Sequence, residues 1–275
     1  MKRGICNLAG VLFLVAAAAG QAQETPATSP PTVPAASRSE ADCTGFISYT
    51  RVPADIYVSG GADNFFRSGV RQYATGDSIF LRASGTTSLV PGTEYALLRP
   101  AKSLFETSRY SGEFRAVGKS GTPYEDVGRA KLTRVTRKGA VAEVTFTCGP
   151  VFPGDLARPY QPRPIPEYTP SKQFDRFVPA NGKRVGVIIA AKNNAATIAT
   201  RDVAYLNLGG KDGVTPGQRY RVFGIPVATG FRSYPETPRE SLGELVILST
   251  QEKSSVGIVV SSTREIFLGE GVELE

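Results

Sequence analysis

The stretch GDSIFLRASGTTSLVPGTEY, residues 76–95, recurs without a gap as RDVAYLNLGGKDGVTPGQRY, residues 201–220. Downstream, residues 128–144 match residues 243–259, so the offset between the copies changes from 125 to 115 residues. One length difference after the first matched block explains this change. Two units of about 100 residues favour duplicated domains over a solenoid of shorter repeats. The positions that recur are Asp77 and Asp202, Leu81 and Leu206, Gly85 and Gly210, Pro91 and Pro216, Gly92 and Gly217, and Tyr95 and Tyr220.

Each unit has the pattern of short β-strands. Residues 203–208, 219–223, 242–249 and 254–260 are rich in β-branched and aromatic residues and alternate in part between apolar and polar. Five or six such strands in about 95 residues are typical of a small barrel or sandwich. The sequence therefore predicts an all-β protein with two tandem, related small β-barrel or sandwich domains.

Turn residues separate the predicted strands. Residues 209–213, GGKDG, tolerate the backbone angles of a tight hairpin connection. Pro216 and Gly217 suit the central pair of a type II turn, because Pro presets φ and Gly accepts a left-handed conformation. The predicted structural turn residues are Gly85, Pro91, Gly92, Gly210, Gly213, Pro216 and Gly217.

Residues 1–22 have the features of a secretory signal peptide. Lys2 and Arg3 precede an apolar run over residues 8–19, and small residues lead to a cleavage site after Ala22. Cys6 precedes the apolar run, whereas a lipobox cysteine follows it, so we do not expect a lipid anchor. The run has about 12 residues where a spanning helix needs about 20, and no later stretch qualifies. We expect a periplasmic or secreted protein with no transmembrane segment in its mature chain.

Differences in amino-acid composition divide the rest of the chain into an arm, two domains and a linker. A stretch rich in Pro, Ala, Ser and Thr cannot bury enough apolar surface to offset the cost of ordering, and is expected to be disordered. A second Pro-rich stretch separates the two units and is expected to be a linker. The predicted organisation is a disordered arm over residues 23–42, a first β-domain over 43–158, a linker over 159–178 and a second β-domain over 179–275.

Cys43 and Cys148 are the two cysteines left after removal of the signal peptide. An even pair in an exported chain predicts a disulfide bond. A closed loop of about 105 residues corresponds to roughly 4.7 kcal/mol of stabilisation in the chain-entropy account. The alternative is two buried free thiols. A metal site is disfavoured, because two cysteines with no histidine supply too few soft ligands.

The charge is mildly basic and scattered. The chain carries 32 basic and 25 acidic residues, a net charge of +7, and loss of Lys2 and Arg3 lowers it to +5. A nucleic-acid binder gathers its basic and aromatic residues on one stripe, and this pattern is missing here. We therefore expect no nucleic-acid partner, with a weak attraction to anionic envelope polymers as the residual alternative.

The sequence contains no histidine, which removes the commonest general base, the Ser-His-Asp and Cys-His systems and the usual zinc sites. The GGKDG segment lacks the spacing and terminal GK[ST] of a phosphate-binding loop. Residues 60–64 lack the ligand pattern of an EF-hand. A paired-carboxylate mechanism could use acidic residues that are more simply explained as turn residues, so we expect no catalytic residue, no cofactor and no metal. The acidic candidates are Asp77, Glu125, Asp126, Asp155, Asp202 and Glu270.

The segments YLNLGGKDGVTPGQRYRVF and LGELVILSTQEKSSVGIVVSSTREIFLGEGVE resemble the C-terminal domain of the flagellar assembly protein T family. They are also similar to β-domains found beside LysM modules in bacterial envelope proteins. The shared features are a glycine turn between strands, a GEL strand, an SS hairpin and a final turn, here Gly269 and Glu270. The resemblance covers residues 202–275 well and residues 76–156 more faintly. It implies a noncatalytic periplasmic scaffold or adaptor.

The leading hypothesis is a noncatalytic exported envelope scaffold or adaptor that binds an envelope protein or a peptidoglycan-associated component. The alternative is an envelope protein that binds or processes polysaccharide. Aromatic side chains exposed in a groove, from Tyr95, Tyr110, Tyr205 and Tyr220, would favour the alternative, whereas a protein-sized apolar patch would favour scaffolding. Tyr95 and Tyr220 occupy equivalent positions of the repeat and are expected in the core.

Overall fold

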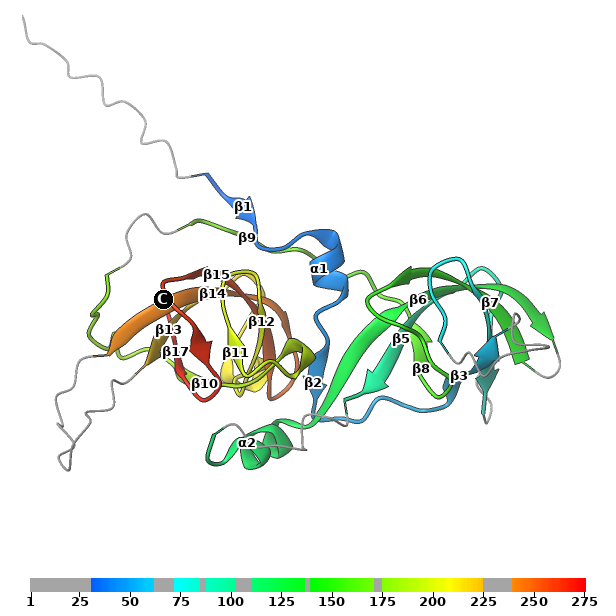
Figure 1. Cartoon of the computed structure of the whole chain (residues 1–275), viewed down its shortest axis with the longest axis horizontal. Coiled ribbons are helices and arrows are strands. Elements are labelled where there is room, and N and C mark those ends of the chain that lie inside the picture. Colours follow the sequence, from blue (N-terminus) through cyan, green and yellow to red (C-terminus); the bar gives the residue numbers. More distant parts are fainter. Residues whose placement is uncertain are drawn as a thin grey trace, which may run out of the picture. The chain divides into compact units, whose positions relative to one another are not determined.

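A computed structural model describes residues 31–61, 72–84, 88–101, 110–136, 139–170, 175–224 and 239–275. These residues form two closed six-stranded β-barrels, which confirms the predicted all-β fold with two tandem domains (Figure 1). The predicted signal peptide, the first residues of the predicted arm and Gly85 lie outside the described residues.

The first barrel closes through six strands in the spatial order β3, β4, β7, β6, β5, β8, and every pairing is antiparallel. A short strand, β2 (Phe46–Ser48), adds to the start of β6. The barrel strands are β3 (Ile56–Gly61), β4 (Ser78–Ala83), β5 (Glu94–Pro100), β6 (Thr122–Thr136), β7 (Gly139–Thr147) and β8 (Leu156–Pro159).

The second barrel repeats this topology strand for strand, in the order β10, β12, β15, β14, β13, β17. A small ribbon of β11 (Thr197–Ile198) and β16 (Ile266–Phe267) has its counterpart in the first unit, the isolated bridge between Tyr73 and Val151. The barrel strands are β10 (Val185–Ala191), β12 (Val203–Leu206), β13 (Arg219–Gly224), β14 (Glu240–Thr250), β15 (Ser255–Ser262) and β17 (Gly271–Leu274).

The turns of the two units match as the aligned sequences predict. Gly92 and Gly217 are left-handed, with φ of 82° and 88°, and follow their prolines in turns closed by i to i+3 hydrogen bonds of 3.2 and 3.3 Å. Asp77 accepts a 2.8 Å hydrogen bond from the backbone N of Ala74, and Asp202 accepts the same bond from Ala199. The extra length of the first unit falls between β5 and β6, where helix α2 (Glu113–Ser120) lies.

The GGKDG segment forms a turn, but the prediction of a hairpin there is wrong. It contains a short 3-10 turn, η4 (Gly210–Asp212), followed by the left-handed Gly213, and it links β12 to β13. Those two strands are not neighbours in the barrel. The connection therefore crosses the end of the barrel. Turn chemistry is local, whereas strand adjacency depends on the whole sheet.

The predicted disordered arm is wrong for its last residues. Within it lie β1 (Val33–Pro34), paired with β9 (Glu167–Tyr168), and helix α1 (Arg38–Asp42). Ser37 and Glu40 form a capping box at the start of α1, a local helix-start signal that the Pro-rich composition of the segment does not reveal. Ala35 and Ala36 pack in one buried cluster with the outward-facing side chains of Val246, Leu248 and Ile258 on β14 and β15.

The two barrels share a buried apolar cluster in addition to their own interiors. Phe46, Ile47, Leu98 and Tyr124 of the first unit pack in this cluster against β10, β12 and β15 of the second. Two buried hydrogen bonds cross the same contact. The Tyr205 hydroxyl donates to the Thr44 carbonyl at 2.6 Å, and the Ser254 hydroxyl donates to the Ile47 carbonyl at 2.6 Å. The duplicated units are therefore packed together as well as linked by the chain.

Candidate binding cleft

Two of the acidic residues singled out in the sequence, Glu125 and Asp155, lie within ion-pair distance of Arg99, and a third, Asp126, lines the same cavity as Arg99. The register of the first barrel brings them together, because β5 lies between β6 and β8. Arg99 on β5 is paired with Glu125 on β6, and the neighbouring Leu98 is paired with both Asp126 on β6 and Leu156 at the start of β8. Asp155 immediately precedes that strand.

Asp155 is held by the arginine in a two-pronged ion pair. The Arg99 Nε and Nη2 atoms each donate to Asp155 at 2.7 Å, and the backbone N of Phe152 donates to the same carboxylate at 2.7 Å. The Asp155 side chain is only 3% exposed, so this pairing offsets the cost of burying its charge. The Arg99 guanidinium also lies over the Phe152 ring, 4.5 Å from its centroid.

Asp126 has a matching partner from the predicted linker, Arg163. The Arg163 Nη1 and Nη2 atoms donate to Asp126 at 2.6 and 2.8 Å, and the backbone N of Gly45 donates to it at 2.8 Å. Burial lowers the pKa of Arg163, but the carboxylates of Asp126 and Asp42 outweigh this and raise that pKa above its usual range. The pair therefore ties together β6, the Pro-rich segment and the loop between α1 and β2.

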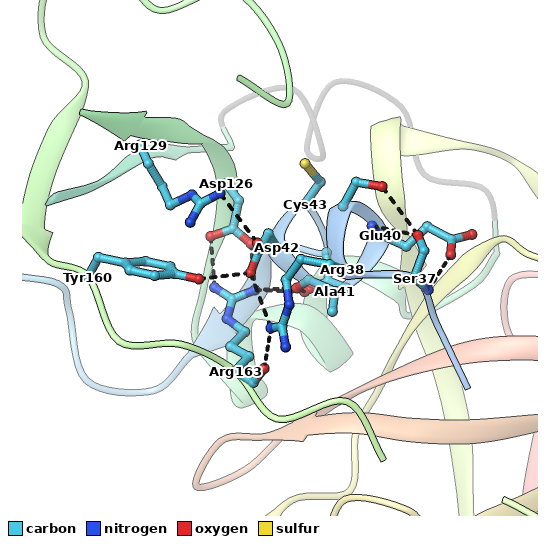
Figure 2. Close-up of polar contacts among 12 residues, drawn as sticks. Ser37, Arg38, Glu40, Ala41, Asp42, Cys43, Asp126, Arg129, Tyr160 and Arg163 are labelled. Atoms are coloured by element: carbon cyan, nitrogen blue, oxygen red, sulfur yellow. Dashed lines mark hydrogen bonds and ion pairs between the residues drawn. The ribbon is translucent and has the colours of Figure 1, made fainter. Parts of the chain in front are cut away.

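Asp42, the last residue of α1, is the centre of a second group of charges (Figure 2). Tyr160 donates to it at 3.1 Å, and Arg129 on β6 lies 3.7 Å away. The Asp42 side chain is 2% exposed. Burial and the nearby carboxylate of Asp42 raise the pKa of Tyr160, because both disfavour a phenolate there. This network holds α1 against the first barrel.

The predicted disulfide forms at the same place. Cys43 directly follows α1, Cys148 directly follows β7, and their Sγ atoms are bonded with the Cα atoms 5.5 Å apart. The bond closes a loop of 105 residues in sequence separation. It fixes the segment that carries Thr44 and Gly45 to the barrel wall.

Two adjoining cavities open beside these contacts, and we call them together the Arg99 cleft. Both are lined by Arg99 and Glu125. The smaller, of about 200 Å³, also has Lys192, Asn193 and Tyr205 of the second unit in its wall. The larger, of about 530 Å³, is lined by the apolar side chains of the turn before β8. Glu125, with a side chain 45% exposed, is the most accessible acidic group here.

One wall of the cleft has an unusual backbone. Asn193 and Asn194 both have φ of 56°, in the left-handed region that non-glycine residues rarely adopt. They follow Lys192 in the short 3-10 segment η3 (Lys192–Asn194) after β10. Such conformations concentrate at ligand-binding sites, where the surrounding structure maintains them.

The two buried carboxylates of the cleft, Asp126 and Asp155, are each held by an arginine. Both oxygens of Asp126 and both oxygens of Asp155 accept hydrogen bonds from an arginine, so neither carboxylate is placed to move a proton. Asp77, Asp202 and Glu270 are separate from them and accept backbone N–H bonds in turns. In the part of the chain that the structure describes, no group of three His, Cys, Asp or Glu side chains is placed to hold a metal ion.

The four tyrosines considered for a saccharide groove are not exposed, although Tyr205 forms part of the wall of the smaller cavity. Tyr95, Tyr205 and Tyr220 are buried, with exposed fractions of 2%, 6% and 0%. Tyr110 is partly buried against the core of the second barrel, and burial followed by the charge of Glu113 raises its pKa to about 12. The expectation that Tyr95 and Tyr220 belong to the core is confirmed.

Sequence reasoning missed the arginines of the site. Arg163 lies in the predicted linker, 37 residues from its partner Asp126, and Arg99 lies 56 residues from Asp155. The sequence carried no specific signal for them, because charged residues such as Arg163 are also usual in a free linker.

No family model matches this chain. No curated protein matches it either. The similarity to the flagellar assembly protein T family thus stays a prediction from the turn motifs. Among the described residues, no helix is both long enough and apolar enough to cross a membrane.

Proposed function

We propose that this protein is a noncatalytic exported scaffold or adaptor of the cell envelope, and that it binds another envelope component at the Arg99 cleft. The observation that carries the proposal is the pairing at this site. Asp126 and Asp155 are both neutralised by arginines and buried, while the Arg99 cleft beside them stays open. Such a site offers a fixed surface in which the two buried carboxylates are already paired and the exposed Glu125, 4.0 Å from Arg99, is left for contact with a partner.

Export is supported by the disulfide, because such bonds persist in oxidising compartments outside the cytoplasm. The cleft also has a composition suited to a peptide or protein partner. Its larger cavity is bordered by Pro100, Phe152 and Pro153, and its smaller one by charged groups of both signs. Apolar surface with a few charged groups is typical of a protein interface.

The proposal can be tested with a photocrosslinking amino acid placed at Glu125 in the full chain, in cells that export it. We expect a discrete crosslinked product with one envelope component, identified by mass spectrometry. The control position is Lys131, which is exposed on the same strand, β6. Identical products at both positions, or none at Glu125, would contradict binding at the cleft.

The noncatalytic part of the proposal has its own test. Purified mature protein incubated with purified peptidoglycan should release no soluble fragments. Release of fragments that is abolished by Asp77→Asn or Asp202→Asn would show an enzyme, and would mean that these carboxylates act beyond their turns.

A further inference from the structure

A second groove, separate from the Arg99 cleft, gathers lysine side chains. It has a volume of about 650 Å³ and is lined by the segment after β2, by α2, and by two turns of the second barrel. We call it the lysine groove. Its lining includes Tyr49, Lys119, Ser120, Asn207, Lys211 and Lys253.

The turns that form the groove are fixed to one another by backbone contacts. The backbone N atoms of Gly210 and Lys211 donate to the carbonyls of Gln251 and Glu252 at 2.8 and 3.0 Å. The Ser254 hydroxyl, next to Lys253, donates to the Ile47 carbonyl of β2 at 2.6 Å. Lys211 and Lys253 are therefore presented on a rigid frame, so a ligand would not have to order the backbone.

The groove has an excess of positive charge. Asp212 is the one acidic residue among the described residues of the lining. It is engaged already, because its Oδ2 accepts from the backbone N of Gly209 at 2.9 Å and its Oδ1 lies 3.4 Å from Arg184. Lys211 pairs with Glu252. Lys119 and Lys253 form no ion pair with any carboxylate of the described residues. Two lysine charges are thus left to attract an anion.

The groove also has features that suit a sugar. Tyr49 is 51% exposed, and Lys253 Nζ lies 3.3 Å from the centroid of its ring. An exposed aromatic ring packs against the C–H face of a sugar ring. Asn207 Oδ1 accepts from the backbone N of Val187 at 2.8 Å, which leaves its amide nitrogen to donate to a hydroxyl.

We propose that the lysine groove binds an acidic glycan, a chain of sugar rings that carry carboxylate or phosphate groups. Lys119 and Lys253, which pair with no described carboxylate, would hold the charges, and Asn207 and the exposed part of the Tyr49 ring, which Lys253 does not cover, would hold the sugar ring. A single-stranded nucleic acid fits less well, because such sites stack successive bases on several aromatic rings. Among the described residues that line this groove, Tyr49 is the one aromatic residue. This ligand class rests on the proposed envelope scaffold. The lysine groove is a different surface from the Arg99 cleft and is tested with purified components, so failure of one proposal can be distinguished from failure of the other.

The test measures affinity of the full mature chain for polygalacturonate, a phosphomannan, inorganic polyphosphate, neutral dextran and single-stranded DNA. The variant Lys119→Gln/Lys253→Gln should weaken binding of the charged glycans at least tenfold. Its matched control, Lys131→Gln/Lys183→Gln, loses the same charge at exposed positions outside the groove and should change the affinity less than twofold. The tighter of the two charged glycans identifies the preferred anionic group.

Tyr49→Ala separates a glycan site from a general polyanion site. It should weaken glycan binding several-fold and leave polyphosphate binding unchanged. Its control is Phe177→Ala, at an aromatic side chain that is 53% exposed and also lies beside a cation. The proposal would be overturned if both lysine pairs caused equal losses of affinity or if Tyr49→Ala had no effect. Binding to dextran as tight as to polygalacturonate, or tighter binding to the DNA, would also overturn it. Thermal melts of every variant exclude loss of folding as the cause.

Discussion

At the scale of single residues, the junction between α1 and the first barrel depends on a few buried charged side chains that contact one another. Asp126 accepts from Arg163 and from the backbone of Gly45, while Asp42 lies beside Arg129 and Tyr160. Buried charges of this kind are costly when a partner is lost, because the remaining charge stays out of water. Substitutions of these single residues therefore test the stability of the junction most sharply.

Asp126→Asn should lower the free energy of unfolding by about 3 kcal/mol, because it leaves the Arg163 guanidinium without its main partner in a largely buried place. Denaturant unfolding followed by circular dichroism measures the change. Glu143→Gln, at an exposed position on β7, is the matched control and should change stability by less than about 0.5 kcal/mol. Equal effects of the two substitutions would contradict the structural role of Asp126.

Gly45→Ala should destabilise the protein by about 2 kcal/mol or more, since a left-handed backbone disfavours any L side chain and the site has no room. Gly45 has φ of 66°, and a Cβ atom there would lie 2.6 Å from the Tyr124 carbonyl and 2.8 Å from the Tyr205 hydroxyl. Gly118→Ala, in α2 with nothing within 4 Å, should instead be neutral or stabilising. A fully stable Gly45→Ala protein would refute the close approach of the two units.

At the scale of elements, strands β13, β14 and β17 place a ladder of charges on one face of the second barrel. Arg221 is paired with Glu244 on one side and with Glu273 on the other. Glu275 is held by Arg219 and Arg221 at 2.8 and 2.6 Å. Glu244 is 5% exposed, and burial, followed by the charge of Glu275, raises its pKa above the usual 4.5.

A raised pKa of a carboxyl group means that the folded state favours its protonated form. The stability that comes from this preference is present below pH 4.5 and is lost as the pH rises through the pKa in the folded protein. Glu244→Gln should therefore melt at a higher temperature than the parent at pH 7, and the difference should vanish below pH 4.5. Thermal melting curves of the parent and the variant, measured from below pH 4.5 to pH 7, test this prediction. A variant that is less stable at pH 7 would show that the attraction of Arg219 and Arg221 for the Glu244 carboxylate outweighs the cost of its burial.

The elements also show what a single sequence can predict. The type II turns at Pro91 and Pro216 could be predicted, because they depend on neighbouring residues and recur in both copies. The crossing path from β12 to β13 and the pairing of Arg163 with Asp126 could not, because they depend on register between distant strands. The start of helix α1 could also have been predicted, because its capping box spans four consecutive residues.

At the scale of the whole molecule, duplication produced two barrels of one topology with different surroundings. The outer face of β14 and β15 in the second barrel is covered by the segment before α1 and by the Pro-rich segment. The Arg99 cleft and the lysine groove each have lining residues from both units. Both proposed binding surfaces therefore require the two barrels to fold as one body.

Scanning calorimetry of the full mature chain tests this requirement most directly. The shared cluster around Ile47 and Val203, with the buried Tyr205 hydrogen bond, predicts a single transition whose calorimetric and van't Hoff enthalpies agree. Tyr205→Phe should lower the stability by about 1 kcal/mol and shift the whole transition without splitting it. Two separate transitions in the parent protein, of which Tyr205→Phe shifts only one or neither, would show that the two barrels do not fold as one body.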